Sequence, residues 1–248
     1  MEIEQQPTQT KKERKEQRRK EKEIQRERRM RARNVKKYAL RGLVLAAIVV
    51  VGVGVWKISE RSTITAELTV NEVLQVQDDD WKKGNPDADV VLYEYLDFEC
   101  EACGAYYPLI KRLVEEYSDR VMFVTRYFPL PSHKNSMTAA LAIEAAGRQG
   151  KYWEMHDLLF EEQQNWGERP APEPVIFERY AEQLNLDMER FKQDVNSTEV
   201  KNRVVRDRNA GRQLNVTGTP TFFLNGEKIQ NPRGYEAFVA LLENALKQ

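Results

Sequence analysis

The segment 42–56 constrains the fold more than any other part of the chain. It reads GLVLAAIVVVGVGVW, contains no charged residue, and lies between Arg41 and Lys57. With its apolar flanks, the segment 39–58 reaches the roughly 20 residues that a helix needs to cross a bilayer. An aromatic residue lies near each end, where the membrane interface favours aromatic side chains. We therefore predict a single transmembrane helix at 39–58, because a buried core helix would not need such flanks.

The charges of the chain are divided between two segments. Residues 1–41 carry 16 Lys and Arg against 7 Asp and Glu, and the rest carries the opposite excess, because the formal net charge is zero. A basic block beside a span marks the cytoplasmic side of the membrane. We predict a cytoplasmic basic tail at 1–38 that contacts anionic lipid, with everything after residue 58 outside the cytoplasm. A nucleic-acid-binding arm is the weaker alternative, because the adjacent span already explains the basic block.

Beyond residue 58 the hydrophobic pattern changes between the strand and helix periods. We predict an extracytoplasmic tether at 59–88 that can hold one short strand near 68–76, followed by a folded domain at 89–248. The elements of this domain follow the order strand, helix, strand, helical insertion, hairpin and helix, at 90–96, 100–117, 121–128, about 134–213, 221–230 and 235–246. This order is that of an α/β thioredoxin fold with a helical insertion.

The chain has two cysteines, and together they form one Cys-x-x-Cys motif at Cys100 and Cys103. A disulfide framework needs several cysteines spread along a chain, so this pair indicates a reactive site. Half of a zinc site is one alternative, but a second cysteine pair is absent, and His133 and His156 are too far apart in the sequence. An inert turn closed by a disulfide is the other alternative. It is disfavoured, because a disulfide that closes so short a loop adds little stability. We predict no metal and no cofactor.

Cys100 follows a predicted strand and opens a predicted helix. Unpaired backbone N–H groups and the positive end of the helix dipole therefore face its sulfur, which favours the thiolate and lowers the pKa of Cys100. Cys103 lies one helical turn further along and can attack a mixed disulfide formed at Cys100. We predict that the pair cycles between a dithiol and a disulfide.

A second motif, Val-Thr-Gly-Thr-Pro at 216–220, comes just before the predicted hairpin. It occurs together with LYEYLDFECEAC at 92–103, FPLPSHKNS at 128–136 and WEMHDLLF at 153–160. These motifs, in this order, resemble the DsbA-like branch of the thioredoxin-fold oxidoreductases. The resemblance covers about residues 80–248 and does not extend to the N-terminal segment.

The resemblance implies a role for each matching residue. Cys100 is similar to the attacking thiol of the family, and Cys103 is similar to the resolving thiol. Pro220 matches the cis-proline that faces the reactive cysteine, and cis X-Pro bonds are uncommon enough to serve a structural purpose. The backbone of Thr219 is implied to pair with the substrate as an added strand.

Glu94 lies in the otherwise apolar segment VVLYEYL, six residues before Cys100. A buried carboxyl group is costly unless it is paired or neutral, so we expect a raised pKa and a part in proton transfer. The resemblance implies a buried acid that exchanges protons with Cys103. Two points stay open at this stage. Glu94 points to water if its strand lies at the sheet edge, and Arg126 on the next strand is a candidate charge partner.

The residues between the cysteines depart from the family pattern. The strongly oxidising members carry Pro-His there, and the cationic imidazole stabilises the thiolate. Here the dipeptide is Glu101-Ala102, and Glu99 adds a second carboxylate. Negative charge raises the pKa of a nearby thiol and makes the disulfide harder to reduce, so the direction of electron flow stays open. We predict that His156 packs within a helix and that His133 caps a helix or lies on the surface.

Together these features predict a membrane-anchored, extracytoplasmic thiol–disulfide oxidoreductase that forms, reduces or reshuffles disulfides in exported proteins. A membrane redox partner would recycle the cysteine pair. The sequence also contains glycosylation sequons at Asn196 and Asn215. A glycan on Asn215 would crowd the Pro220 loop, which favours a bacterial cell membrane over the endoplasmic reticulum. The alternative function is a thioredoxin-fold chaperone or docking module without redox turnover.

Overall fold

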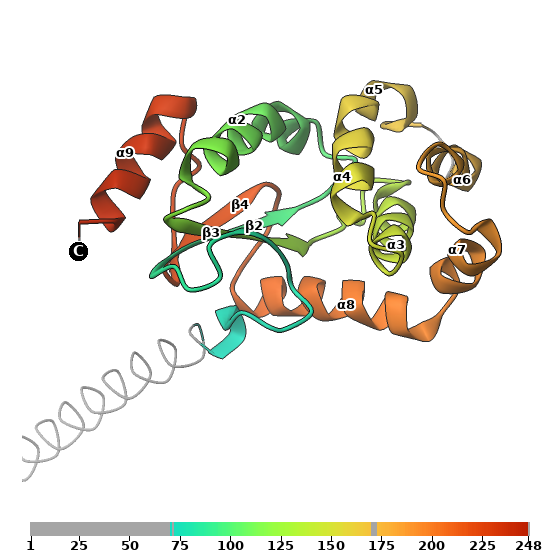
Figure 1. Cartoon of the computed structure of the whole chain (residues 1–248), viewed down its shortest axis with the longest axis horizontal. Helices are drawn as coiled ribbons and strands as arrows, with labels where there is room; N and C mark the ends of the chain where they lie inside the picture. Colours follow the sequence, from blue (N-terminus) through green and yellow to red (C-terminus); the bar gives the residue numbers. More distant parts are fainter. Residues whose placement is uncertain (1–69, 71, 170–172, 248) are drawn as a thin grey trace, which may run out of the picture. The chain divides into compact units, whose positions relative to one another are not determined.

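The computed structural model describes residues 70, 72–169 and 173–247 (Figure 1). The predicted basic tail at 1–38, the predicted span at 39–58 and the first part of the predicted tether lie outside these residues. In the part of the chain that the structure describes, no helix has both the length and the hydropathy of a membrane span.

A five-stranded sheet lies at the centre of the domain, with the order β1-β3-β2-β4-β5. Strands β2 and β3 are parallel, and the other neighbouring pairs are antiparallel. The strands are β1 (Trp81–Gly84), β2 (Val90–Leu96), β3 (Val121–Tyr127), β4 (Thr221–Leu224) and β5 (Glu227–Lys228). The predicted strand-helix-strand unit and the C-terminal hairpin are therefore confirmed.

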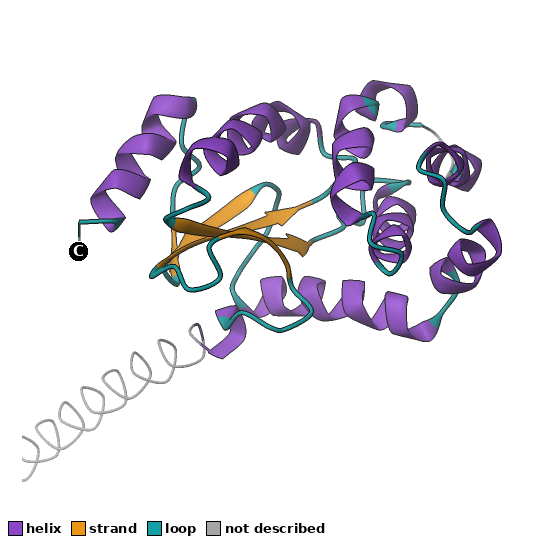
Figure 2. Ribbon diagram, viewed as in Figure 1, coloured by secondary structure: helices purple, strands orange, loops and turns teal. Residues whose placement is uncertain are grey.

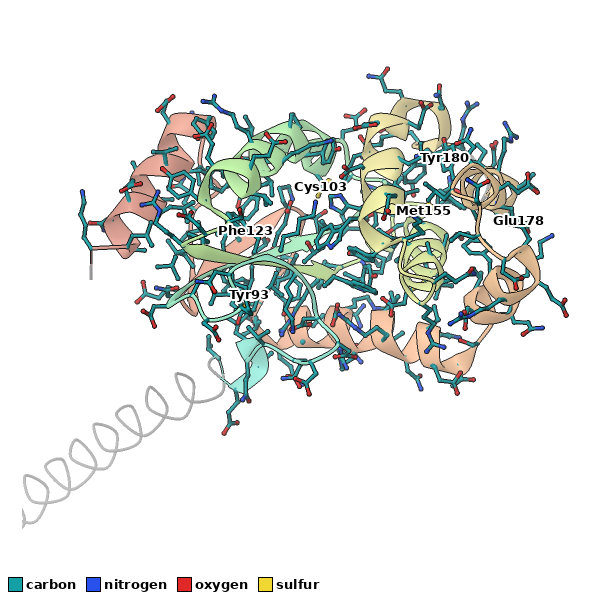
Figure 3. All side chains as sticks on the ribbon, in the orientation of Figure 1. Tyr93, Cys103, Phe123, Met155, Glu178 and Tyr180 are labelled. Carbon is teal, nitrogen blue, oxygen red and sulfur yellow. The ribbon has the colours of Figure 1, made fainter. Side chains whose placement is uncertain are left out.

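Two helices cover one face of the sheet, α2 (Glu101–Tyr117) and α9 (Tyr235–Ala245), as Figure 1 shows. Side chains alternate between the faces of β2 and β3, because successive residues of a strand point in opposite directions. Phe123 packs on the α2 side, whereas Tyr93 packs on the opposite side (Figure 3). Glu94 pairs in register with Thr125, two residues beyond Phe123, so Glu94 lies on the α2 face.

The predicted helical insertion is confirmed, and it supplies most of the helices seen in Figure 2. Its helices are α3 (Ser136–Gly147), α4 (Tyr152–Glu161), α5 (Gln163–Trp166), α6 (Pro174–Gln183), α7 (Met188–Val195) and α8 (Thr198–Gln213). The insertion has its own apolar core, with Trp166, Tyr152 and Met155 almost fully buried. Helix α8 closes against the second face of the sheet, where a Cβ atom at Gly211 would lie 2.7 Å from the ring of Phe128.

The described part of the segment predicted as a tether, residues 70 and 72–88, takes part in the folded domain. The short strand predicted near 68–76 is wrong, because Val70 and residues 72–74 are helical and Leu74 is buried. Strand β1 also lies within the predicted tether, and it pairs with β3 along all four of its residues. The ring of Trp81 stacks on Tyr152 of the insertion, with 4.0 Å between the ring centroids. The folded domain therefore begins before residue 89.

Arg126 holds this early segment against the sheet, and it is not the partner of Glu94. It follows Thr125 in β3, so its side chain points to the face opposite Glu94. Its guanidinium lies 2.7 Å from the carboxylate of Asp80 and donates to the carbonyl oxygens of Val73 and Gln75, at 2.8 Å each. The predicted Glu94–Arg126 pair is therefore wrong, because the two residues are one position out of register.

Arg126→Met should lower the free energy of unfolding by about 3 kcal/mol, because it leaves the buried carboxylate of Asp80 without its main charge partner. Urea denaturation of the chain, followed by tryptophan fluorescence, measures this change. Arg206→Met is the matched control, since Arg206 forms a half-exposed pair with Asp79 and should cost less than about 1 kcal/mol. Equal effects of the two variants would contradict the anchoring role of Arg126.

Candidate active site

Cys100 is the N-cap residue of α2, in extended backbone conformation directly after the loop that leaves β2. Its Sγ lies 3.3 Å from the carbonyl oxygen of Thr219. The pKa of Cys100 is lowered to about 5, chiefly by the hydrogen bond from the Cys103 thiol. Burial opposes this shift, while the side chain of Thr219 and the backbone N–H groups of Ala102 and Cys103 add to it. The expected stabilisation of the thiolate at the start of this helix is thus present in the geometry.

Cys103 lies one turn further along α2 and has no exposed surface. Burial raises the pKa of this thiol well above its usual value, and the neighbouring Cys100 and Glu94 raise it further. Both cysteines are free thiols. The two sulfurs are therefore chemically unequal: one is an anion at neutral pH, and the other keeps its proton.

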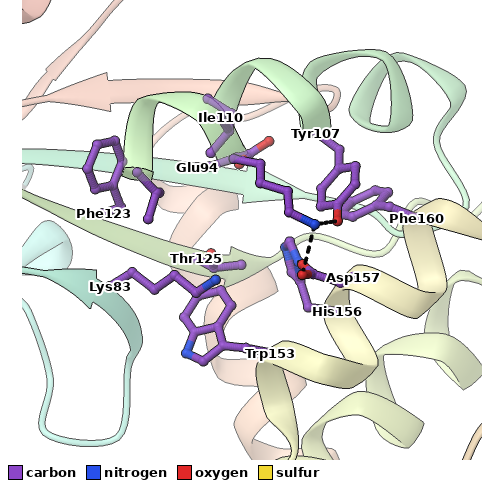
Figure 4. A pocket seen from close by; sticks show the side chains of 12 residues that line it. Lys83, Glu94, Tyr107, Ile110, Phe123, Thr125, Trp153, His156, Asp157 and Phe160 are labelled. Carbon is purple, nitrogen blue, oxygen red and sulfur yellow. Dashed lines mark hydrogen bonds and ion pairs between the residues drawn. The ribbon is translucent and has the colours of Figure 1, made fainter. Parts of the chain in front are cut away.

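Glu94 lies in β2, between β3 and β4, so its strand is central and the edge-strand interpretation is wrong. The side chain is buried on the α2 face, and burial alone raises the pKa of its carboxyl group to about 8. The carboxyl group lines a small cavity together with Ile110, Phe123 and Lys111 (Figure 4). Two of the lining residues, Lys111 and Tyr107, are joined by a hydrogen bond in which Lys111 donates to the hydroxyl of Tyr107 at 2.9 Å. Glu94 is thus a neutral acid at neutral pH, in the buried layer beneath Cys103.

The Thr219–Pro220 peptide bond is cis, as the resemblance implies. The loop between α8 and β4 brings this dipeptide against Cys100, which is 119 residues earlier in the chain. All five predicted site residues, Glu94, Cys100, Cys103, Thr219 and Pro220, are thus in the described structure, and Cys100 contacts Thr219 at the start of α2.

Two residues that the sequence did not reveal as site residues hold Cys100 in place. The side-chain amide of Gln163 in α5 donates to the carbonyl oxygens of Phe98 and Cys100, at 2.8 and 2.9 Å. Glu99 accepts the backbone N–H of Asn135 at 2.6 Å and that of Glu168 at 3.2 Å. No sequence signal marks either contact, because both join segments far apart in the chain.

These contacts correct the expected effect of the carboxylates on Cys100. The carboxylate of Glu99 is bound by backbone N–H groups of the insertion, and Glu101 is exposed to solvent, which screens its charge. The pKa of Cys100 is lowered and not raised. Hydrogen bonds to its sulfur are the leading causes that lower this pKa, and the carboxylates of Glu99 and Glu101 are not among the leading causes.

The two histidines occupy different surroundings. His156 packs among aromatic rings of the insertion, as predicted, and burial lowers its pKa. The Nδ1 atom of His133 lies 2.7 Å from the carboxylate of Asp97. His133 does not cap a helix, since Asn135 is the N-cap of α3, but its side chain is partly exposed, as predicted. The prediction did not include the contact of its ring with Asp97, a buried carboxylate three residues before Cys100.

A family model described as Thioredoxin matches residues 77–244 of this chain. The chain belongs to the thioredoxin family. The match to this family begins inside the predicted tether, in agreement with the early segment that packs on the sheet.

Solved structures of similar fold are DsbA-like. One is α-DsbA1 of Wolbachia pipientis, at a TM-score of 0.65 and 22% identity, covering 72% of this thioredoxin-family chain and 96% of that chain. Another is BdbD of Bacillus subtilis in its oxidised form, at a TM-score of 0.61 and 24% identity, and the match covers 67% of this chain and 92% of that chain. A thioredoxin-like oxidoreductase of Silicibacter pomeroyi matches at a TM-score of 0.60 and 25% identity, and the match covers 69% of this chain and 95% of that chain.

Curated relatives carry a different kind of name. The Na(+)/H(+) antiporter NhaA 3 of Salinispora tropica is 40% identical over 169 residues, which is 68% of this chain and 25% of that protein. The Na(+)/H(+) antiporter NhaA 1 of Salinispora arenicola is 38% identical over 170 residues, with the same shares. This thioredoxin-family chain therefore spans about a quarter of the length of these curated relatives.

Glu94→Gln should make the stability of the reduced protein less dependent on pH. The carboxyl group holds its proton up to about pH 8 when folded, against a usual pKa of 4.5, so between these values the folded state binds more protons than the unfolded state. The free energy of unfolding of the native protein therefore falls as pH rises, by about 1.4 kcal/mol per unit of pKa difference.

Urea denaturation of both proteins at pH 4.5 and pH 8 measures this effect. Between the lower and the higher pH, the free energy of unfolding of the variant should rise by about 2–4 kcal/mol relative to that of the native protein, because the glutamine side chain does not titrate. A difference between the proteins that is the same at both pH values would show that Glu94 titrates as an exposed carboxyl group.

Proposed function

We propose that this chain is a membrane-anchored, extracytoplasmic thiol–disulfide oxidoreductase that acts on exported proteins through Cys100 and Cys103. One observation carries the proposal: a thiol with a lowered pKa at a helix start lies one turn from a fully buried thiol with a raised pKa. Such an unequal pair suits thiol–disulfide exchange, because the attacking thiol must be ionised, whereas the resolving thiol stays protonated until the mixed disulfide has formed.

The chemistry of one cycle follows from the two pKa values. The thiolate of Cys100 attacks one sulfur of a client disulfide, forming a mixed disulfide and releasing the other client sulfur as a thiolate. Cys103 then loses its proton and attacks the Cys100 sulfur, which forms the Cys100–Cys103 disulfide and releases the second client thiolate. The reverse sequence transfers the disulfide to a client dithiol, so the same groups serve oxidation and reduction.

Glu94 exchanges a proton with Cys103 in this cycle: its ionised form, the minor form below its pKa of about 8, takes the proton of Cys103, and its protonated form returns a proton in the reverse direction. Cys103 cannot ionise unaided, because burial holds its pKa well above the usual value. Glu94 shares the buried layer and has a pKa of about 8, which is close to the value that suits a proton acceptor at neutral pH. The cavity beside its carboxyl group offers a route for the proton to leave.

The segment before Pro220 binds the client backbone. The carbonyl oxygen of Thr219 lies 3.3 Å from the attacking sulfur, so a peptide that pairs with this segment as an added strand brings its own sulfur to Cys100. The pair needs no cofactor for the exchange itself. A membrane redox partner recycles it, and a lowered Cys100 pKa favours the reduced protein, which makes its disulfide a better oxidant.

Cys100→Ser should lose all exchange turnover, whereas Cys103→Ser should accumulate mixed disulfides with clients, because nothing resolves them. Turnover with glutathione disulfide and non-reducing electrophoresis with a disulfide-bonded client measure the two effects. The double variant is the control and should form no adduct. Client binding by the double variant, combined with no turnover by the native chain, would instead support a docking module.

The membrane anchor is the second part of the proposal. Deletion of residues 39–58 should move the chain from the membrane fraction to the soluble fraction, because the deletion removes the apolar span. Deletion of residues 11–37 is the control and should leave the chain in the membrane fraction. A chain that stays in the membrane fraction after loss of 39–58 would contradict the anchor.

A further inference from the structure

The Cys-x-x-Cys motif contains no cation, although the Cys100 thiolate lies at its start. The dipeptide between the cysteines is Glu101-Ala102, and Glu99 precedes the nucleophile. A cationic side chain within a few ångströms would stabilise the thiolate, and none is adjacent in the sequence. Any cation that acts on the Cys100 sulfur is therefore supplied by a segment outside the motif.

His133 is brought to this site by Asp97. The carboxylate of Asp97 has no exposed surface, and its Oδ2 atom lies 2.7 Å from Nδ1 of His133. The same oxygen accepts the backbone N–H of Leu130 at 2.9 Å, and Oδ1 accepts that of Glu99, also at 2.9 Å. These three contacts fix both the carboxylate and the loop that carries His133.

Asp97 also holds the backbone of the nucleophile. Its carbonyl oxygen accepts the N–H of Cys100 at 3.1 Å, so one residue binds His133 through its side chain and Cys100 through its main chain. The ring of His133 is 27% exposed, so it exchanges protons with solvent while it stays bound to Asp97. The geometry is that of an imidazolium held in place by a buried carboxylate.

The surroundings of His133 raise its pKa and so favour its imidazolium form. Burial opposes the charge of His133, but the hydrogen bond to Asp97 and the negative charges of Asp97, Cys100 and Glu99 raise its pKa above 6.5. The pKa of Cys100 is about 5. The raised pKa of His133 thus favours its cationic form at the acidic pH values where the Cys100 thiol loses its proton.

We propose that His133, held by Asp97, supplies the positive charge that the Cys-x-x-Cys dipeptide lacks, and so stabilises the Cys100 thiolate. The inference rests on the proposed function, and it names His133 as a positioning and charge-supplying residue of the same site. The interaction is reciprocal: the Cys100 thiolate stabilises the charged form of His133, and charged His133 stabilises the thiolate by the same free energy. The carboxylate of Glu99 accepts backbone N–H groups of the insertion, and its negative charge favours the cationic form of His133.

His133→Gln tests the proposal with little change in shape, because a glutamine amide can still donate to Asp97. In the reduced full-length chain, the pKa of Cys100 should rise by about one unit, which lowers the thiolate fraction about tenfold below the titration midpoint. Ultraviolet absorbance of the thiolate against pH measures this shift. The equilibrium constant with glutathione should change up to about tenfold, equivalent to about 30 mV in reduction potential.

Two further variants separate charge from structure. Lys134→Gln removes a charge from the neighbouring exposed residue and should shift the pKa of Cys100 far less. His133→Lys keeps a cation beside Asp97 and should restore most of the native Cys100 pKa. A native-like Cys100 pKa in His133→Gln, or equal shifts in His133→Gln and His133→Lys, would overturn the proposal. The absorbance measurement reports the ionisation of Cys100 and needs no turnover. A failure of the proposed function would therefore appear in the turnover assay of the native chain and not in this titration.

Discussion

The site depends on one physical asymmetry: two thiols a single helical turn apart lie in different electrostatic environments. Cys100 at the start of α2 meets hydrogen-bond donors that stabilise its anion, whereas burial of Cys103 disfavours an anion there. The two pKa values are therefore pushed in opposite directions, and in the proposed cycle this difference sets which sulfur attacks first. Glu94, whose pKa is raised to about 8, lies on the α2 face of the same sheet, where the proposed cycle needs a buried group that exchanges protons.

The rest of the domain maintains this asymmetry through contacts between distant segments. The insertion holds the Cys100 backbone through Gln163, which is 63 residues away, and binds the carboxylate of Glu99 through Asn135 and Glu168. The C-terminal hairpin region contributes the carbonyl oxygen of Thr219. The helical insertion is thus part of the framework of the candidate site, because it binds the backbone of Phe98 and Cys100 and the carboxylate of Glu99.

Much of the fold could be predicted from local pattern. The apolar runs of β2 and β3, the helical periods of the insertion and the hairpin before α9 all carry signals over a few residues, and the structure confirms them. Strand β1 carries no such signal, because Trp-Lys-Lys-Gly is short and polar. Its place is set by the backbone ladder with β3 and by the stacking of Trp81 on Tyr152, which only the folded chain provides. The Glu94–Arg126 pairing failed on register, since a shift of one residue reverses the face of a strand.

By itself, the sequence determined the local chemistry: a cysteine at the start of a helix, a second cysteine one turn later, and a Thr-Pro segment before a strand. These features depend on spacings of one to three residues, which the chain specifies directly. Only the tertiary structure decided which charged groups act on the sulfur. It turned Glu99 toward the insertion, buried Glu94 beneath α2, and bound His133 to Asp97. Electrostatic energies depend on distance and burial, and neither is contained in the order of residues along the chain.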